Sequence, residues 1–123
     1  MDHASILIVE DDGLIAMHMT EMLERVGYKV MAPEYSGENA VSRIRSGPIP
    51  DVILMDIGLS GEMDGIQTAQ EIRKLARVPI IFLTAYSDDS RIRGARQISS
   101  YGYLLKPCME HDLVNAIENA LGR

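Results

Sequence analysis

The sequence predicts a single α/β domain in which helices cover both faces of a parallel β-sheet. Short apolar runs alternate with amphipathic stretches along the 123 residues, and this alternation favours repeated β-α units. The runs at 6–9 and 52–55 are apolar at every position, which is typical of strands buried on both faces. The expected strands are Ser5–Glu10, Tyr28–Ala32, Val52–Asp56, Pro79–Thr84 and Gly102–Leu105.

A helical pattern follows each expected strand, and the first three helices begin at residues that can act as N-caps. Asp12, Ser36 and Asp64 each carry a side-chain oxygen that can accept a hydrogen bond from a first-turn N–H. The fourth helix is expected to begin near Asp88, and the last to span 110–121. The residues expected to face the core are Ile15, Met19, Met22, Leu23 and Val26 in the first helix, Ala40, Val41 and Ile44 in the second, Ile66, Ala69, Ile72 and Leu75 or Ala76 in the third, and Leu113, Ile117 and Leu121 in the last.

Composition and charge argue against several classes of function. The formal net charge is −6, and residues 1–60 carry 4 Lys and Arg against 10 Asp and Glu. An acidic chain without a basic stripe is a poor candidate for direct nucleic-acid binding, which requires cations that neutralise phosphates. No apolar run is long enough to span a bilayer, the N-terminal residues do not match a signal peptide, and Cys108 is the only cysteine. We therefore expect a cytoplasmic domain whose partners are proteins.

Four of the five expected strands end in polar groups suited to one reaction. Glu10 and Asp11 follow the first strand, Asp56 ends the third, Thr84 ends the fourth and Lys106 follows the fifth. Ligands of open α/β sheets bind at the carboxyl ends of the strands. Carboxylates gathered there repel one another unless a cation compensates, and Mg²⁺ prefers oxygen ligands. Each residue alone could be an ordinary surface group, but together they predict Mg²⁺-dependent phosphoryl transfer to a carboxylate.

The motifs that surround these residues resemble those of response-regulator receiver domains in order and spacing. They are Ile6-Leu7-Ile8-Val9-Glu10-Asp11-Asp12, Val52-Ile53-Leu54-Met55-Asp56, Met63-Asp64-Gly65, Phe82-Leu83-Thr84-Ala85 and Gly102-Tyr103-Leu104-Leu105-Lys106-Pro107. The resemblance covers residues 1–123 as one receiver domain. It implies a doubly wound, flavodoxin-like (βα)5 sandwich whose parallel strands lie in the order 2-1-3-4-5.

The resemblance also implies the roles of the acidic residues in a two-component phosphorelay. Asp56 would accept a phosphoryl group from the phosphohistidine of a sensor histidine kinase or phosphotransfer protein. Asp11, Asp56 and the Gly58 backbone carbonyl would bind Mg²⁺ directly, and Glu10 would bind it through water. The domain would catalyse its own phosphorylation and its later dephosphorylation.

Further residues would hold the phosphoryl group and transmit its presence. By the same resemblance, Thr84 and Lys106 would bind the phosphoryl oxygens, and the Lys106-Pro107 bond would be cis. Movement of Thr84 would let the Tyr103 ring turn inward and reshape the surface of the fourth helix, fifth strand and fifth helix. That surface would contact a downstream protein or output domain, and it is also a candidate for pairing two copies of the chain.

The sequence departs from the family pattern in the loop after Asp56. Residues 58–63 form a slightly longer loop that lacks the frequent proline. Gly58 and Tyr86 stand at two positions that flank the approach to the phosphoryl group. We hypothesise that they set the hydrolysis rate through water access, and unchanged phosphoryl lifetimes in Gly58→Asn and Tyr86→Glu variants would contradict this.

Three other functions are open alternatives. A flavin-binding electron carrier could share the fold, but Glu10, Asp11 and Asp12 would repel its phosphate group. An aspartyl-nucleophile phosphatase also uses aspartate and Mg²⁺, yet residues 56–58 lack the second aspartate that would act as general acid. A pseudo-receiver that only docks proteins would not need the intact set of acids, threonine and lysine.

Overall fold

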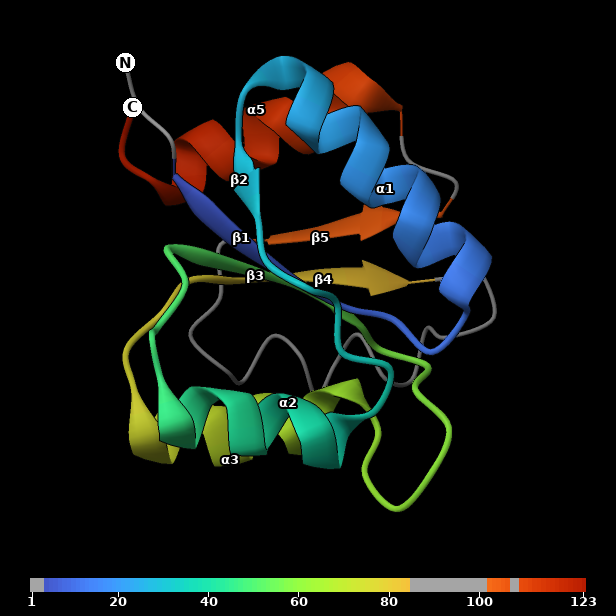
Figure 1. Ribbon diagram of the computed structural model, residues 1–123, viewed down its shortest axis with the longest axis vertical. Coiled ribbons are helices and arrows are strands. Elements are labelled where there is room, and N and C mark those ends of the chain that lie inside the picture. Colours follow the sequence, from blue (N-terminus) through green and yellow to red (C-terminus); the bar gives the residue numbers. More distant parts are fainter. Residues whose placement is uncertain (1–3, 85–101, 107–108) are drawn as a thin grey trace.

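The fold is a five-stranded parallel sheet with helices on both faces (Figure 1). The computed structural model describes residues 4–84, 102–106 and 109–123. In chain order the elements are β1 Ser5–Val9, α1 Gly13–Val26, β2 Lys29–Val30, α2 Gly37–Ser46, β3 Val52–Asp56, α3 Gly65–Leu75, β4 Ile80–Thr84, β5 Gly102–Leu105 and α5 Glu110–Ala120. The strand order β2-β1-β3-β4-β5 confirms the predicted topology. The fourth helix expected near Asp88 falls outside the described residues.

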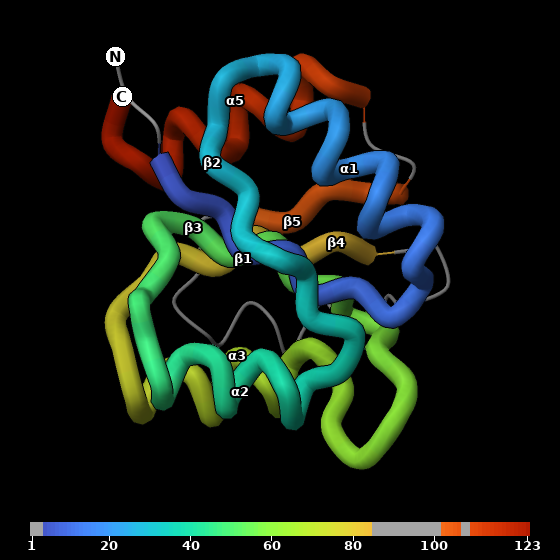
Figure 2. The backbone as a smooth tube through the Cα atoms, in the orientation of Figure 1, coloured from blue at the N-terminus to red at the C-terminus, as the bar shows by residue number. Residues whose placement is uncertain are grey.

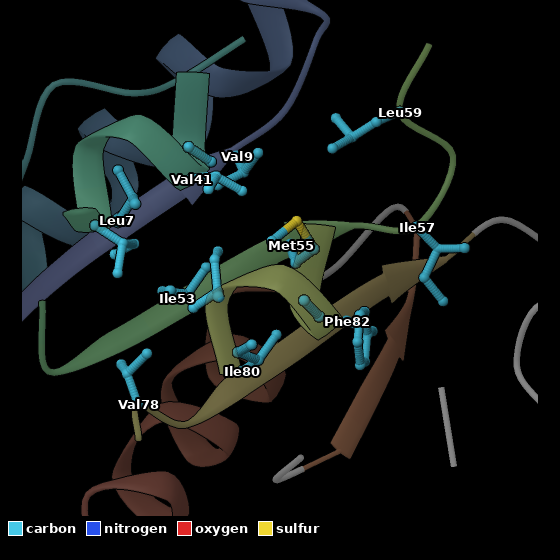
Figure 3. Packing of buried hydrophobic residues seen from close by; sticks show 14 residues of the cluster. Leu7, Val9, Val41, Ile53, Met55, Ile57, Leu59, Val78, Ile80 and Phe82 are labelled. Carbon is cyan, nitrogen blue, oxygen red and sulfur yellow. The ribbon is translucent and has the colours of Figure 1, made fainter. Parts of the chain in front are cut away.

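The strands separate two apolar clusters, one on each face of the sheet. Alternate residues of β1 point to opposite faces: Leu7 and Val9 pack with residues of α2 and α3, whereas Ile6 and Ile8 pack with residues of α1 and α5. Figure 1 shows these helix pairs on opposite sides of the sheet, and Figure 3 shows the cluster on the α2 and α3 side. Burial on both faces explains why residues 6–9 of β1 and 52–55 of β3 are all apolar.

All three predicted N-caps are confirmed. The Asp12 carboxylate accepts hydrogen bonds from the N–H groups of Leu14 and Ile15, at 3.0 and 3.2 Å. Ser36 Oγ accepts one from Asn39 N at 3.1 Å, and Asp64 forms a reciprocal capping box with Gln67. These caps fix where α1, α2 and α3 begin, and therefore where the loops at the carboxyl end of the sheet turn into helices.

The buried face of α1 differs from the expected one. Met19 and Leu23 are buried as expected, and Met22 packs partly buried against the same cluster. Ile15 and Val26, however, are 38% and 43% exposed, and Ala16 is buried in addition. The small side chain of Ala16 is fully buried and begins the buried stripe at the N-terminal end of the helix. The hydrophobic pattern favoured the larger side chains and therefore placed the stripe wrongly at both ends.

One expected boundary needs correction. β2 has two residues instead of the five expected at 28–32, because Pro33 follows closely and has no N–H to donate to β1. In α3, Ala69 and Ile72 are buried as expected. Of the two residues left open at the end of this helix, Ala76 packs against the core, whereas Leu75 is 41% exposed.

Within the described ranges, none of the helices combines the length and apolar character needed to cross a membrane.

Candidate functional site

The carboxyl ends of four strands bring the predicted site residues to one end of the sheet. Asp56 and Thr84 are the last residues of β3 and β4, Glu10 follows β1 and Lys106 follows β5. The Lys106 N–H continues the ladder by donating to the Thr84 carbonyl at 2.8 Å. Parallel strands in register end side by side, so positions far apart in the sequence meet here.

Three carboxylates lie together at this end of the sheet. Glu10, Asp11 and Asp56 each offer one oxygen, and these atoms all lie within 4.8 Å of one another. Glu10 is 1% exposed and Asp56 is 5% exposed, whereas Asp11 lies nearer the surface. Such a group is electrostatically unfavourable without cations, because water screens buried charges poorly.

Lys106 supplies one positive charge to the cluster. Its Nζ atom lies 2.7 Å from Glu10 Oε1 and 3.1 Å from Asp56 Oδ1. Burial alone would lower the pKa of Lys106, but the hydrogen bond to Glu10 and the negative charges of Asp56 and Glu10 outweigh it and raise this pKa. The lysine therefore keeps its ammonium charge.

The Glu10 carboxyl remains poorly compensated even with Lys106 beside it. Burial raises the pKa of Glu10 to about 7, and the charge of Asp56 adds to this effect. Hydrogen bonds from Lys106 and from the Asp12 N–H act in the opposite direction but do not restore the ordinary value. Among the described residues, the three carboxylates are therefore accompanied by one ammonium group, and a further cation would stabilise the cluster.

The donor set fits a hard divalent cation. All the available side-chain ligand atoms are carboxylate oxygens, which Mg²⁺ prefers, and Mg²⁺ needs only one or two carboxylates because it keeps several waters. Gly58, whose carbonyl was a predicted ligand, lies beside the cluster and donates its N–H to Asp56 Oδ1 at 3.0 Å. Both this N–H and the Lys106 ammonium bind Asp56 Oδ1.

The backbone of Gly65 packs directly against the backbone of Asp56 and Ile57, which explains the glycine in the motif Met63-Asp64-Gly65. Its N–H donates to the Ile57 carbonyl at 2.9 Å. A Cβ atom at position 65 would overlap the carbonyl oxygen of Asp56 and lie 2.7 Å from Ile57 Cα. Because these are backbone atoms of β3 and its end, any side chain there would push Asp56 out of place.

Two polar residues at the site escaped the sequence interpretation. Ser60 donates two hydrogen bonds to Asp11 Oδ2, from its N–H at 3.1 Å and from its Oγ at 2.7 Å. Glu38 of α2 accepts a hydrogen bond from Met63 N at 3.1 Å. Both tie down the loop between β3 and α3 (residues 57–64), which Figure 2 shows beyond the carboxyl end of the sheet. No local pattern marks them, because these contacts join positions 49 and 25 residues apart.

The predicted switch residues are described only in part. Thr84 is 1% exposed. Tyr103 is half-buried on β5, where it packs against the apolar cluster on the α2 and α3 side of the sheet. Tyr86 and Pro107 lie outside the described residues, and with them the expected cis bond between Lys106 and Pro107.

An apolar groove opens next to the site between α1 and α5. It has a volume of about 390 Å³. Its lining residues are Ile15, His18, Met19, Met22, Leu83, Lys106 and Leu113. Lys106 lines the groove and also contacts Glu10 and Asp56, so the groove and the carboxylate cluster adjoin at this residue.

Comparison with known proteins gives a consistent family. The sequence matches the family described as "Response regulator receiver domain" over residues 6–118. It is 37% identical over 118 residues to the transcriptional regulatory protein PdtaR of Mycobacterium tuberculosis, covering 96% of this chain and 57% of the relative. It is 36% identical over 119 residues to the positive alginate biosynthesis regulatory protein of Pseudomonas aeruginosa, covering 94% of this chain and 46% of the relative. The chain thus spans about half the length of these curated relatives.

Solved structures agree with the sequence relatives. The N-terminal domain of a response regulator/sensory box/GGDEF protein from Carboxydothermus hydrogenoformans is 39% identical with a TM-score of 0.89, covering 96% of this chain and 94% of that one. The receiver domain of a sensor histidine kinase from Pseudomonas aeruginosa, solved with a magnesium ion in its active-site cleft, is 31% identical with a TM-score of 0.87. That match covers 99% of this chain and 100% of the other. The chain therefore belongs to the response regulator receiver domain family of two-component systems.

Proposed function

We propose that the protein is a phosphorylation switch in which Asp56 accepts a phosphoryl group from a phosphohistidine. The donor would be a sensor histidine kinase or a phosphotransfer protein. The observation that carries this proposal is the position of the Asp56 carboxylate: it is 5% exposed, bound at Oδ1 by Lys106 and Gly58, and grouped with Glu10 and Asp11.

The reaction would require Mg²⁺ at the carboxylate cluster. Asp11, Asp56 and the Gly58 carbonyl would hold the ion directly, and Glu10 would hold it through a water. When bound, the ion would neutralise charge on the carboxylates and on the transferred group. The magnesium ion in the receiver domain of the Pseudomonas aeruginosa sensor kinase supports this assignment.

Each residue of the site would have a distinct part in the transfer. A carboxylate oxygen of Asp56 would attack the phosphorus atom while the bond from phosphorus to the donor imidazole nitrogen breaks, and that nitrogen would leave with the electron pair. The Lys106 ammonium and the Thr84 hydroxyl bind oxygens of the transferred group. In the later hydrolysis, water would attack the phosphorus atom and the Asp56 carboxylate would leave. We propose that Gly58 and Tyr86 set the rate of this hydrolysis by controlling water access.

Phosphorylation would change the protein surface through Thr84 and Tyr103. It adds about −1.5 to −2 charges at the end of β3, and movement of the Thr84 hydroxyl toward them would make room for the Tyr103 ring. The surface of the expected fourth helix, β5 and α5 would then bind a downstream protein, an output domain or a second copy of the chain. The half-buried position of Tyr103 is compatible with two ring orientations.

The groove between α1 and α5 is the proposed docking site for the protein that carries the phosphohistidine. It adjoins Lys106 and is lined by the apolar side chains of Ile15, Met19 and Met22, so an apolar helix seated there would stand next to Asp56. Ile15→Glu is expected to slow phosphorylation by a kinase while leaving phosphorylation by acetyl phosphate unchanged. Equal loss with both donors would contradict docking at this groove.

A direct experiment tests the acceptor. Incubation with acetyl phosphate and Mg²⁺, followed by intact mass measurement, should add one phosphoryl group to the wild type and none to Asp56→Asn. Chelation of Mg²⁺ should prevent the addition. Equal adducts on both proteins would defeat the assignment, and the absence of any adduct would favour the alternative of a docking-only pseudo-receiver. Turnover of phosphomonoesters would instead identify an aspartyl-nucleophile phosphatase.

A further inference from the structure

The loop between β3 and α3 is anchored beside the carboxylate cluster at three points. The Leu59 side chain is 5% exposed and packs into the cluster on the α2 and α3 side of the sheet (Figure 3). The next residue, Ser60, binds Asp11, and the Met63 N–H binds Glu38 of α2. Core packing on one side of Ser60 and a helix contact on the other therefore hold this serine in position over Asp11.

Both hydrogen bonds from Ser60 reach the same oxygen of Asp11. The N–H lies 3.1 Å and the Oγ lies 2.7 Å from Oδ2. A carboxylate oxygen has two lone pairs, so these two donors occupy Oδ2. These bonds hold the carboxylate in one orientation beside Glu10, with which it also interacts, and Asp56.

We propose that Ser60 is a positioning residue for the metal: its two hydrogen bonds to Oδ2 hold the Asp11 carboxylate in the orientation in which it would bind the cation. The inference rests on the Mg²⁺ site of the proposed function. Outer hydrogen bonds of this kind orient ligand carboxylates, and their removal typically weakens metal binding about 10- to 100-fold. Without Ser60, the Asp11 side chain would have to be ordered by the ion itself.

The contact between Ser60 and Asp11 also couples the loop to the ion. When two binding events influence each other, each changes the affinity of the other by the same factor. If the contact between Ser60 and Asp11 strengthens Mg²⁺ binding by some factor, then bound Mg²⁺ must strengthen that contact by the same factor. Hydrogen exchange of the Ser60 amide should therefore slow when Mg²⁺ is added, which a purely structural role of Ser60 would not require.

Calorimetric titration with MgCl₂ tests the proposal in the intact protein. Ser60→Ala removes the Oγ donor and should weaken Mg²⁺ binding about 10-fold, whereas Ser60→Thr keeps both donors and should bind nearly as the wild type does. Ser42→Ala is the matched control, because Ser42 is an exposed serine on α2 that makes no side-chain hydrogen bond to the carboxylate cluster among the described residues. Unchanged or tighter Mg²⁺ binding by Ser60→Ala would overturn the positioning role, the tighter result because it would mean that Ser60 competes with the ion.

A second variant separates this inference from the proposed function. Asp11→Asn should lose most Mg²⁺ affinity if Asp11 is a ligand. If the wild type binds no Mg²⁺, or if Asp11→Asn binds it equally well, the metal site itself is wrong and the role of Ser60 falls with it. If Asp11→Asn loses affinity and Ser60→Ala does not, only the role of Ser60 is refuted.

Discussion

The Lys106 Nζ atom lies 2.7 Å from Glu10 Oε1, an oxygen of a carboxyl group that is almost completely buried. The two residues are 96 positions apart in the sequence, and the parallel sheet brings them together because their strands end at the same edge. The pair accounts for the position of the lysine next to Asp56. It also makes the charge of the site depend on whether Glu10 is ionised.

The raised pKa of Glu10 predicts a pH-dependent stability in the absence of Mg²⁺. The folded protein releases this proton near pH 7, whereas the unfolded chain releases it near 4.5. Between these values the folded state binds more protons, so the contribution of Glu10 to the free energy of unfolding falls as pH rises. Glu10→Gln removes this contribution. The free energy of unfolding of the variant, relative to that of the wild type, should therefore increase from pH 5 to pH 8.

Urea denaturation in EDTA at the two pH values measures the effect. The quantity to compare is the difference in unfolding free energy between Glu10→Gln and the wild type. A difference that is the same at both pH values would show that Glu10 titrates normally in the folded protein.

Mg²⁺ should stabilise the fold through the same cluster. An ion that binds only the folded state at ten times its dissociation constant contributes about 1.4 kcal/mol, which corresponds to roughly 3–6 °C in Tm for a domain of this size. Differential scanning calorimetry with MgCl₂ and with KCl at equal ionic strength measures the shift. Asp11→Asn should abolish it, and an equal shift in that variant would place the ion elsewhere.

Gly65→Ala should damage both the fold and the site. The added methyl group would overlap backbone atoms of Asp56 and Ile57, so we expect a loss of stability of about 1–3 kcal/mol or more together with slower phosphorylation of Asp56. Gly13→Ala is the control, because the nearest heavy atom to its Cβ would be Tyr35 Cε1 at 4.0 Å. Urea denaturation and intact mass should separate the two variants, and equal behaviour would contradict the packing role of Gly65.

Core packing on α3 can be tested on two residues of one helix. Ile72 is fully buried and Leu75 is 41% exposed. Ile72→Ala should lower the free energy of unfolding by about 2–5 kcal/mol, and Leu75→Ala should change it by less than about 0.5 kcal/mol. Denaturant unfolding of the pair checks this, and similar losses would mean that the exposed and buried faces of α3 are assigned wrongly.

Much of this fold was predictable because its signals are local. The fully apolar runs of β1 and β3 indicated strands covered on both faces, and Asp12, Ser36 and Asp64 indicated where helices begin. Each of these signals is read from a few neighbouring residues. The buried stripe of α1 was less predictable, since Ala16 is small and its burial depends on how closely the helix approaches the sheet.

The sequence by itself determined the alternation of strands and helices and the kinds of side chain that stand at the strand ends. Only the tertiary structure decided that Ser60 clamps Asp11, 49 positions away, and that Lys106 divides its ammonium between Glu10 and Asp56. The physical reason is that such contacts depend on the paths of loops and on side-chain orientation within a packed core. Hydrophobic periodicity and capping act over a few residues and do not encode those paths.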